Sequence, residues 1–140
     1  MPDLSKQQLI ELAEAKLADA KFLVDGTRYG SAYYLAGYAV ELLLKAVISS
    51  RFQTDTIPDP GWLKDIFTHN LEKLAKLALL GDDLKLKNDS DAEFKARWDI
   101  VTEWSESSRY YVRQQGDAET LIEAIDNAQH GVFQWLRAGL

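Results

Sequence analysis

Arginines and aromatic residues alternate at one place in the chain, the run Arg109-Tyr110-Tyr111-Val112-Arg113. A guanidinium pairs with a phosphate and a phenol ring stacks on an unpaired base, so this run suits a local contact with RNA or a nucleotide. The same residues suit a turn packed against helices, and we favour that structural interpretation. Arg109, Tyr110 and Arg113 are therefore candidate ligand-binding residues.

A second polar set, Tyr34, Tyr38, Glu41 and Lys45, recurs every three or four residues within residues 31–50. This spacing places the four side chains on one face of a helix. Glu41 and Lys45 have the order and separation of a helical ion pair. Tyrosines in such a row are able to stack on a base, but they are more often core residues whose hydroxyls find a partner. These four residues complete the candidate ligand-binding set.

The other faces of residues 31–50 are apolar, which predicts a helix at the centre of a bundle or at a subunit interface. Glu41 would then be buried and would need a cationic partner. Arg28, Arg109 or Arg113 could supply a bidentate guanidinium. We favour a structural role for Glu41 over a catalytic one. Because Glu41 and Lys45 occupy the middle of the apolar stretch, we do not expect a membrane span.

The remaining residues that could do chemistry are sparse. The chain has no cysteine and two histidines, His69 and His130, neither of which has a further ligand at metal-binding spacing. We therefore predict no metal and no cofactor. His69 directly precedes a predicted helix, which favours capping or packing, and His130 is expected to be solvated. No glycine-rich phosphate loop or nucleophile elbow is present.

The composition indicates one globular domain, residues 1–140. Acidic residues outnumber basic residues 22 to 16, and the bases are dispersed, so general DNA binding is not expected. The start of the chain lacks the pattern of a signal peptide, which predicts a cytoplasmic protein.

Apolar periodicity of the helical type predicts an all-α, up-and-down bundle of four principal helices plus a short fifth. Strands are not expected, because no segment alternates with a period of two. Glycines 26 and 30 are expected to end the first helix in left-handed backbone. Residues 81–89 are predicted to be a mobile loop. The predicted helices begin at a capping box at 5–8, at residue 31, near residue 70, at a second capping box at 90–93, and at a cap by Asp117. A connection at 53–70 contains one short helical turn.

The stretch 32–46, read as AYYLAGYAVELLLKA, resembles the second helix of HEPN domains. Four further pieces are similar to the same family: the preceding helix with Ala20, Leu23 and Tyr29, then His69-Asn70-Leu71, Ser108-Arg109-Tyr110-Tyr111 and the run 132–136. The resemblance implies a helical bundle that often dimerises. Many HEPN proteins are metal-independent ribonucleases, and others are inactive partners of nucleotidyltransferases in toxin–antitoxin or defence systems.

Active HEPN members carry an Arg followed after four to six residues by His. No arginine has that spacing before His69 or His130, and residues 114–120, which follow Arg109 and Arg113, contain no His. Metal-free RNA cleavage needs a group that moves a proton near neutral pH. We therefore predict a non-catalytic HEPN-like binding module that forms a homodimer through the central region and pairs with a nucleotidyltransferase or an RNA-related partner.

Two alternatives remain open. The first is a divergent metal-independent endoribonuclease that uses Arg109 or Arg113, with Glu41 or a tyrosine in place of the missing His. The second is a small-ligand pocket between the central helix and the final helix.

Overall fold

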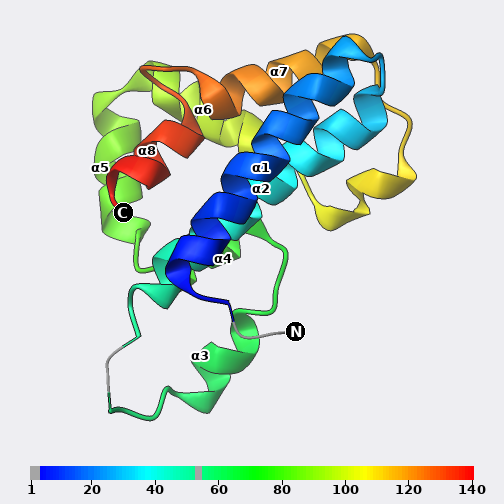
Figure 1. Cartoon of the computed structure of the whole chain (residues 1–140). Helices are drawn as coiled ribbons and strands as arrows, with labels where there is room; N and C mark the ends of the chain where they lie inside the picture. The colour runs from blue at the N-terminus through cyan, green and yellow to red at the C-terminus, as the bar shows by residue number, and fades with distance from the viewer. Residues whose placement is uncertain (1–3, 53–54) are drawn as a thin grey trace.

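The two longest helices, α1 (Lys6–Asp25) and α2 (Tyr29–Ser49), form an antiparallel pair in the computed structural model of the chain, which describes residues 4–52 and 55–140 (Figure 1). The other described elements are α3 (Pro60–Asp65), α4 (Leu71–Leu77), α5 (Gly81–Ser90), α6 (Ala92–Thr102), the 3-10 helix η1 (Glu106–Tyr110), α7 (Gln115–Asp126) and α8 (Val132–Ala138). The all-α prediction is confirmed, with more and shorter helices than expected. Residues 1–3 and 53–54 lie outside the described residues. They belong to the chain start, where no signal peptide is predicted, and to the predicted connection at 53–70.

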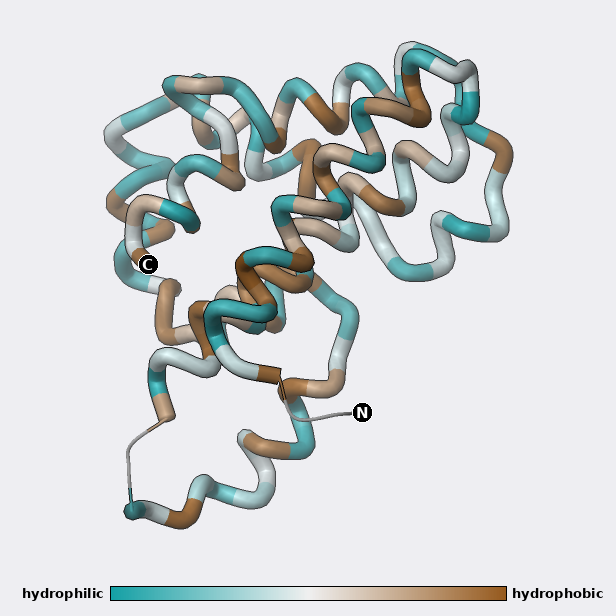
Figure 2. The backbone as a smooth tube through the Cα atoms, in the orientation of Figure 1, coloured by the Kyte–Doolittle hydropathy of each residue, from teal (hydrophilic) through white to brown (hydrophobic). Residues whose placement is uncertain are grey.

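Helix α2 is the central element, because α1, α4, η1, α7 and α8 all pack against it. Thirteen of its 21 residues are buried, including Glu41. Among the described residues α2 is also the one helix long and apolar enough to cross a membrane, but 72% of its most apolar window is buried within the protein. In Figure 2, hydrophobic residues recur along both α1 and α2 where the two helices lie side by side.

Helix α1 begins as predicted and ends differently. Ser5 Oγ accepts a hydrogen bond from Gln8 N at 3.1 Å, and Gln8 Oε1 accepts from Ser5 N at 2.9 Å. The turn into α2 contains one left-handed residue, and it is Thr27, with φ of 61°, rather than either glycine. Arg28 N donates to Leu23 O at 2.8 Å, so backbone bonding holds Thr27 in a conformation that costs a β-branched residue energy.

The predicted mobile loop at 81–89 is wrong, because these residues form α5. Asp82 and Asp83 lie in its first turn and Lys87 in its last, which is the arrangement that the helix dipole favours. The next cap also differs from the prediction. Asp91 Oδ1 accepts from Phe94 N at 3.0 Å, whereas Ser90 Oγ donates to Lys87 O within α5.

The predicted last helix is interrupted between α7 and α8. Asn127 Oδ1 accepts hydrogen bonds from Gln129 N and His130 N, at 3.0 and 2.8 Å, and so forms a turn. At Gly131 an added Cβ would lie 2.5 Å from Asn127 O, so the tight turn has room for glycine alone. Asp117 does not cap this helix from outside. It is the third residue of α7, in the first turn, where its carboxylate accepts from Gln114 N at 2.9 Å.

Candidate functional site

The polar row of α2 forms the floor of the candidate site. Tyr34, Tyr38, Glu41 and Lys45 share one face of the helix, as their spacing predicts. The start of α4 and the 3-10 helix η1 both pack against α2. The chain thereby brings residues from three separate segments to this face.

Glu41 is the buried charge at the centre of the site, with 1% of its surface exposed. Its Oε2 lies 3.3 Å from Lys45 Nζ, and its Oε1 lies 2.8 Å from His69 Nδ1. The predicted ion pair with Lys45 is therefore present. The predicted arginine partner is wrong, because a histidine 28 positions along the chain takes that place. Two partners on two oxygens offset the cost of removing a carboxylate from water.

His69 links α2 to η1. Its Nε2 lies 3.2 Å from Glu106 Oε2, while its Nδ1 faces Glu41. A neutral imidazole has one N–H and donates to one carboxylate at a time, whereas an imidazolium donates to both. His69 does not cap α4, since Asn70 Oδ1 accepts from Lys73 N at 2.9 Å.

An indole ring covers the site between the tyrosines and the charged cluster. Trp104 is 3% exposed, and its ring lies flat on Gly37, where an added Cβ would lie 2.3 Å from three ring atoms. Tyr34 lies 6.0 Å from Trp104 and 6.1 Å from Tyr38, measured between ring centroids. Burial, and then the negative charge of Glu41, raises the pKa of Tyr38.

Arg109 lies at the tyrosine end of the site. Its guanidinium is 4.9 Å from the centroid of the Tyr110 ring, and the hydroxyls of Tyr110 and Tyr34 raise its pKa. Arg109 and Tyr34 line a shallow cavity of about 350 Å³ together with Gly30 and Tyr111. Tyr110 itself is 74% exposed.

Arg113 is separated from that row. Its guanidinium stacks 4.1 Å from the centroid of Tyr33, the neighbour of Tyr34 that points to a different side of α2. Its Nε is buried and has no hydrogen-bond partner among the described residues. The cavity that it lines contains Glu103 and Asp117. The seven candidate ligand-binding residues therefore do not form one continuous site, since Arg113 belongs to another hollow.

The chemistry available beside His69 is that of a small polar cleft. A cavity of about 290 Å³ is lined by His69, Glu106 and Trp104 and by the hydroxyl-bearing Thr68 and Ser105. It holds groups able to accept or donate protons. Within residues 4–52 and 55–140, no cluster of three or more potential ligands is arranged to hold a metal ion.

Sequence reasoning missed His69, Glu106 and Trp104 as members of this site. The one usable signal was Glu41, because a buried carboxylate requires a donor and the chain has only two histidines. Nothing in the spacing of the residues selected His69 over an arginine.

The second histidine lies outside the site, and the prediction that it is solvated is wrong. His130 Nδ1 lies 2.8 Å from Asp91 Oδ2, and the His130 side chain is 31% exposed. The hydrogen bond from His130, the Phe94 backbone N–H and Lys87 hold the pKa of Asp91 well below its usual value.

Comparison with known families adds one finding. The model of the HEPN domain family matches residues 7–138, nearly the whole chain. Neither a curated protein nor a solved structure matches the chain.

Proposed function

Since the chain belongs to the HEPN domain family, we propose that it is a non-catalytic helical binding module that acts as a homodimer. The observation that carries the non-catalytic part of this proposal is how the ring of His69, the one histidine of the candidate site, is bonded. Both of its ring nitrogens face carboxylates, Glu41 at 2.8 Å and Glu106 at 3.2 Å. A general acid or base needs a nitrogen within reach of the substrate. The Arg-to-His spacing of active members is also missing.

The dimer surface that we propose is residues 110–112, at the end of η1, rather than the central helix, because most of α2 is already buried within the chain. Tyr110, Tyr111 and Val112 are 74%, 60% and 92% exposed, which makes three consecutive apolar side chains in water. Figure 1 shows this part of the chain projecting from the bundle between η1 and α7. Contiguous exposed apolar residues mark interaction surfaces, and aromatic residues and arginine are enriched there.

Charge favours a second copy as the occupant of this surface. The whole chain has a net charge of −6, so two copies repel each other over most of their surfaces. Residues 107–116 contain two arginines and no acidic residue. A segment with two arginines and no acidic residue attracts the acidic surface of a second copy, so we expect this segment of each copy to pack against acidic residues of the other.

Light scattering coupled to size exclusion tests the dimer. We expect the wild-type chain to run as a dimer and Val112→Asp to run as a monomer. Ile57→Asp is the matched control, because Ile57 is 95% exposed but lies before α3, away from this segment. A monomeric wild-type chain, or a Val112→Asp chain that stays dimeric, would contradict the proposal.

A divergent endoribonuclease is the second candidate, and one observation favours it. A buried carboxylate on Nδ1 of a histidine, as Glu41 provides, is the arrangement that orients an imidazole for proton transfer at Nε2. Glu106 and Arg109 lie on the same turn of η1, so an arginine is close along the chain to this histidine's partner.

Incubation of the purified chain with mixed RNA separates the two candidates. The binding-module proposal predicts that the RNA stays intact. Cleavage that is lost in both Arg109→Ala and His69→Ala would establish the endoribonuclease instead. Cleavage that persists in both variants would point to a contaminating nuclease and leave the binding-module prediction standing.

A nucleotidyltransferase is the partner that we propose for the dimer, by analogy with inactive HEPN chains. The neighbouring reading frames are examined first, and co-expression with any nucleotidyltransferase found there tests the pairing. We expect the two proteins to co-purify at a fixed ratio. Failure to co-purify would remove the partner while leaving the dimer prediction intact.

A further inference from the structure

Another cavity lies at the C-terminal end of α2, away from the candidate site around Glu41. It has a volume of about 540 Å³ and is bounded by the last turn of α2, by α5 and by α8. Figure 1 shows α5 and α8 next to each other, with the C-terminus beside them. Sites for small organic ligands fall in the range of roughly 300–1,000 Å³, so this cavity has room for a compact molecule.

One wall of the cavity carries a fixed guanidinium. Arg51 follows α2, and its Nε donates to Ala78 O at 3.0 Å. This bond orients the side chain at the cavity while using one of five N–H donors. No other described residue accepts from Arg51. Toward residues 4–52 and 55–140 the Nη groups therefore keep their donors, and together they form a planar fork, the geometry that fits a carboxylate.

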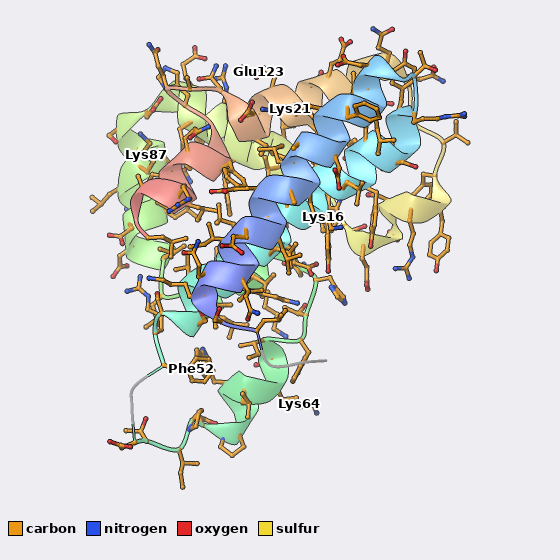
Figure 3. All side chains as sticks on the ribbon, viewed as in Figure 1. Lys16, Lys21, Phe52, Lys64, Lys87 and Glu123 are labelled. Carbon is orange, nitrogen blue, oxygen red and sulfur yellow. The ribbon has the colours of Figure 1, made fainter. Side chains whose placement is uncertain are left out.

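A second cation, Lys87 of α5, also lines the cavity. Lys87 (labelled in Figure 3) is held by Asp91 at 3.2 Å and by the Phe94 ring at 5.5 Å. Asp83 is the one acidic residue that lines the cavity, against two bases. The lining is thus net positive in a chain whose net charge is −6, which favours an anionic occupant.

The remaining lining is apolar and includes a flat ring. Trp135 lines the cavity and is supported from behind by Phe94, whose centroid is 5.1 Å away. Leu86 lines the α5 side and is 69% exposed. An apolar occupant of the cavity would cover part of the Leu86 side chain, which is favourable because it removes apolar surface from water.

We propose that this cavity binds a small monocarboxylate with a flat apolar body. The carboxylate pairs with the Nη groups of Arg51, with Lys87 adding attraction as a second cation of the lining. The apolar body lies between Trp135 and Leu86. This cavity is separate from the candidate site around Glu41 and from the proposed dimer surface.

Isothermal titration calorimetry of the full chain with 2-naphthoate tests the proposal, with the uncharged 2-naphthylmethanol as the paired probe. We expect 2-naphthoate to bind once per chain and the alcohol to bind at least about tenfold more weakly, because it cannot form the charge-assisted pair. Arg51→Gln should weaken 2-naphthoate by about tenfold or more. Arg28→Gln removes an exposed arginine at the other end of α2 and should change nothing.

A second variant keeps the test decisive if Arg51→Gln disturbs the end of α2. Leu86→Glu changes an exposed side chain and places a negative charge against the ligand, so it should also weaken 2-naphthoate. Absence of binding overturns the proposal. So does equal affinity for the acid and the alcohol, or equal affinity of wild type and Leu86→Glu for 2-naphthoate.

Discussion

Replacement of Gly37 by alanine is expected to destabilise the chain, although alanine is the better helix former. Gly37 lies in the middle of α2, and Trp104 lies directly on it. An alanine Cβ would lie 2.3 Å from three atoms of the indole ring, well inside van der Waals contact. The ring is buried, so it is not free to swing into solvent.

Two opposing terms set the size of this effect. Alanine in place of glycine inside a helix stabilises by about 1 kcal/mol. Overpacking of a closely packed core costs about 1–3 kcal/mol, and a contact this short with a rigid ring belongs at the upper end. We expect a net loss of about 2 kcal/mol in the free energy of unfolding, which corresponds to a fall in Tm of roughly 6–10 °C.

Thermal and urea unfolding followed by circular dichroism measure this loss, and the chain supplies its own control. Gly30 is also in α2, but an added Cβ there would meet only Tyr111 O at 3.7 Å, so Gly30→Ala should be neutral or stabilising. In a Trp104→Ala background the clash is absent, and Gly37→Ala should then stabilise. A Gly37→Ala chain as stable as wild type would refute the reasoning.

Two further predictions concern the charged side chains. Asp91→Asn keeps a good helix cap but removes the Asp91 carboxylate, whose pKa is lowered in the folded state. A carboxylate with a lowered folded pKa stabilises the fold fully above about pH 4, and this stabilisation is lost progressively as the pH falls toward the folded pKa. The stability difference between wild type and Asp91→Asn should therefore shrink in acid, and acid-unfolding curves that stay parallel would contradict this. Glu41→Gln leaves Lys45 and His69 facing an uncharged amide, so urea unfolding should show a loss of about 1–3 kcal/mol, and an unchanged midpoint would show that the buried charge does not stabilise the fold.

The fold class and the central position of α2 could be predicted because they depend on apolar periodicity. A helix that is apolar on most faces has to be covered on most faces, whatever covers it. The capping box at Ser5 could be predicted for a similar reason, since its hydrogen bonds join residues three apart.

Where two local patterns competed, the sequence was ambiguous. Residues 81–90 are polar enough for a loop, yet their charges are ordered as a helix requires, and the helix formed. Ser90 and Asp91 are both good caps, and the side chain of Asp91 also reaches His130. The break at 127–131 depends on close backbone packing around Gly131, which a periodic apolar stripe running through it conceals.

The partners within the candidate site depend on contacts between distant segments, so spacing could not identify them. The row on α2 was predictable from positions 34 to 45. The partner of Glu41, His69, could not be predicted, because the length of the connection before His69 does not determine which way its side chain points. Arg113 illustrates the same limit, since it is four residues from Arg109 yet stacks on Tyr33 in a different hollow.

The position of η1 follows from α2 more than from its own five residues. Trp104, just before η1, is held on Gly37, and Glu106, its first residue, is held by His69 and through it by Glu41. A short 3-10 helix has little stability of its own. With its start fixed at two points, the turn that follows places Arg109 and the exposed residues 110–112 where they are. Substitutions at Gly37 or Glu41 should therefore disturb the proposed dimer surface from a distance, whereas Val112→Asp should disturb the surface and leave the fold intact.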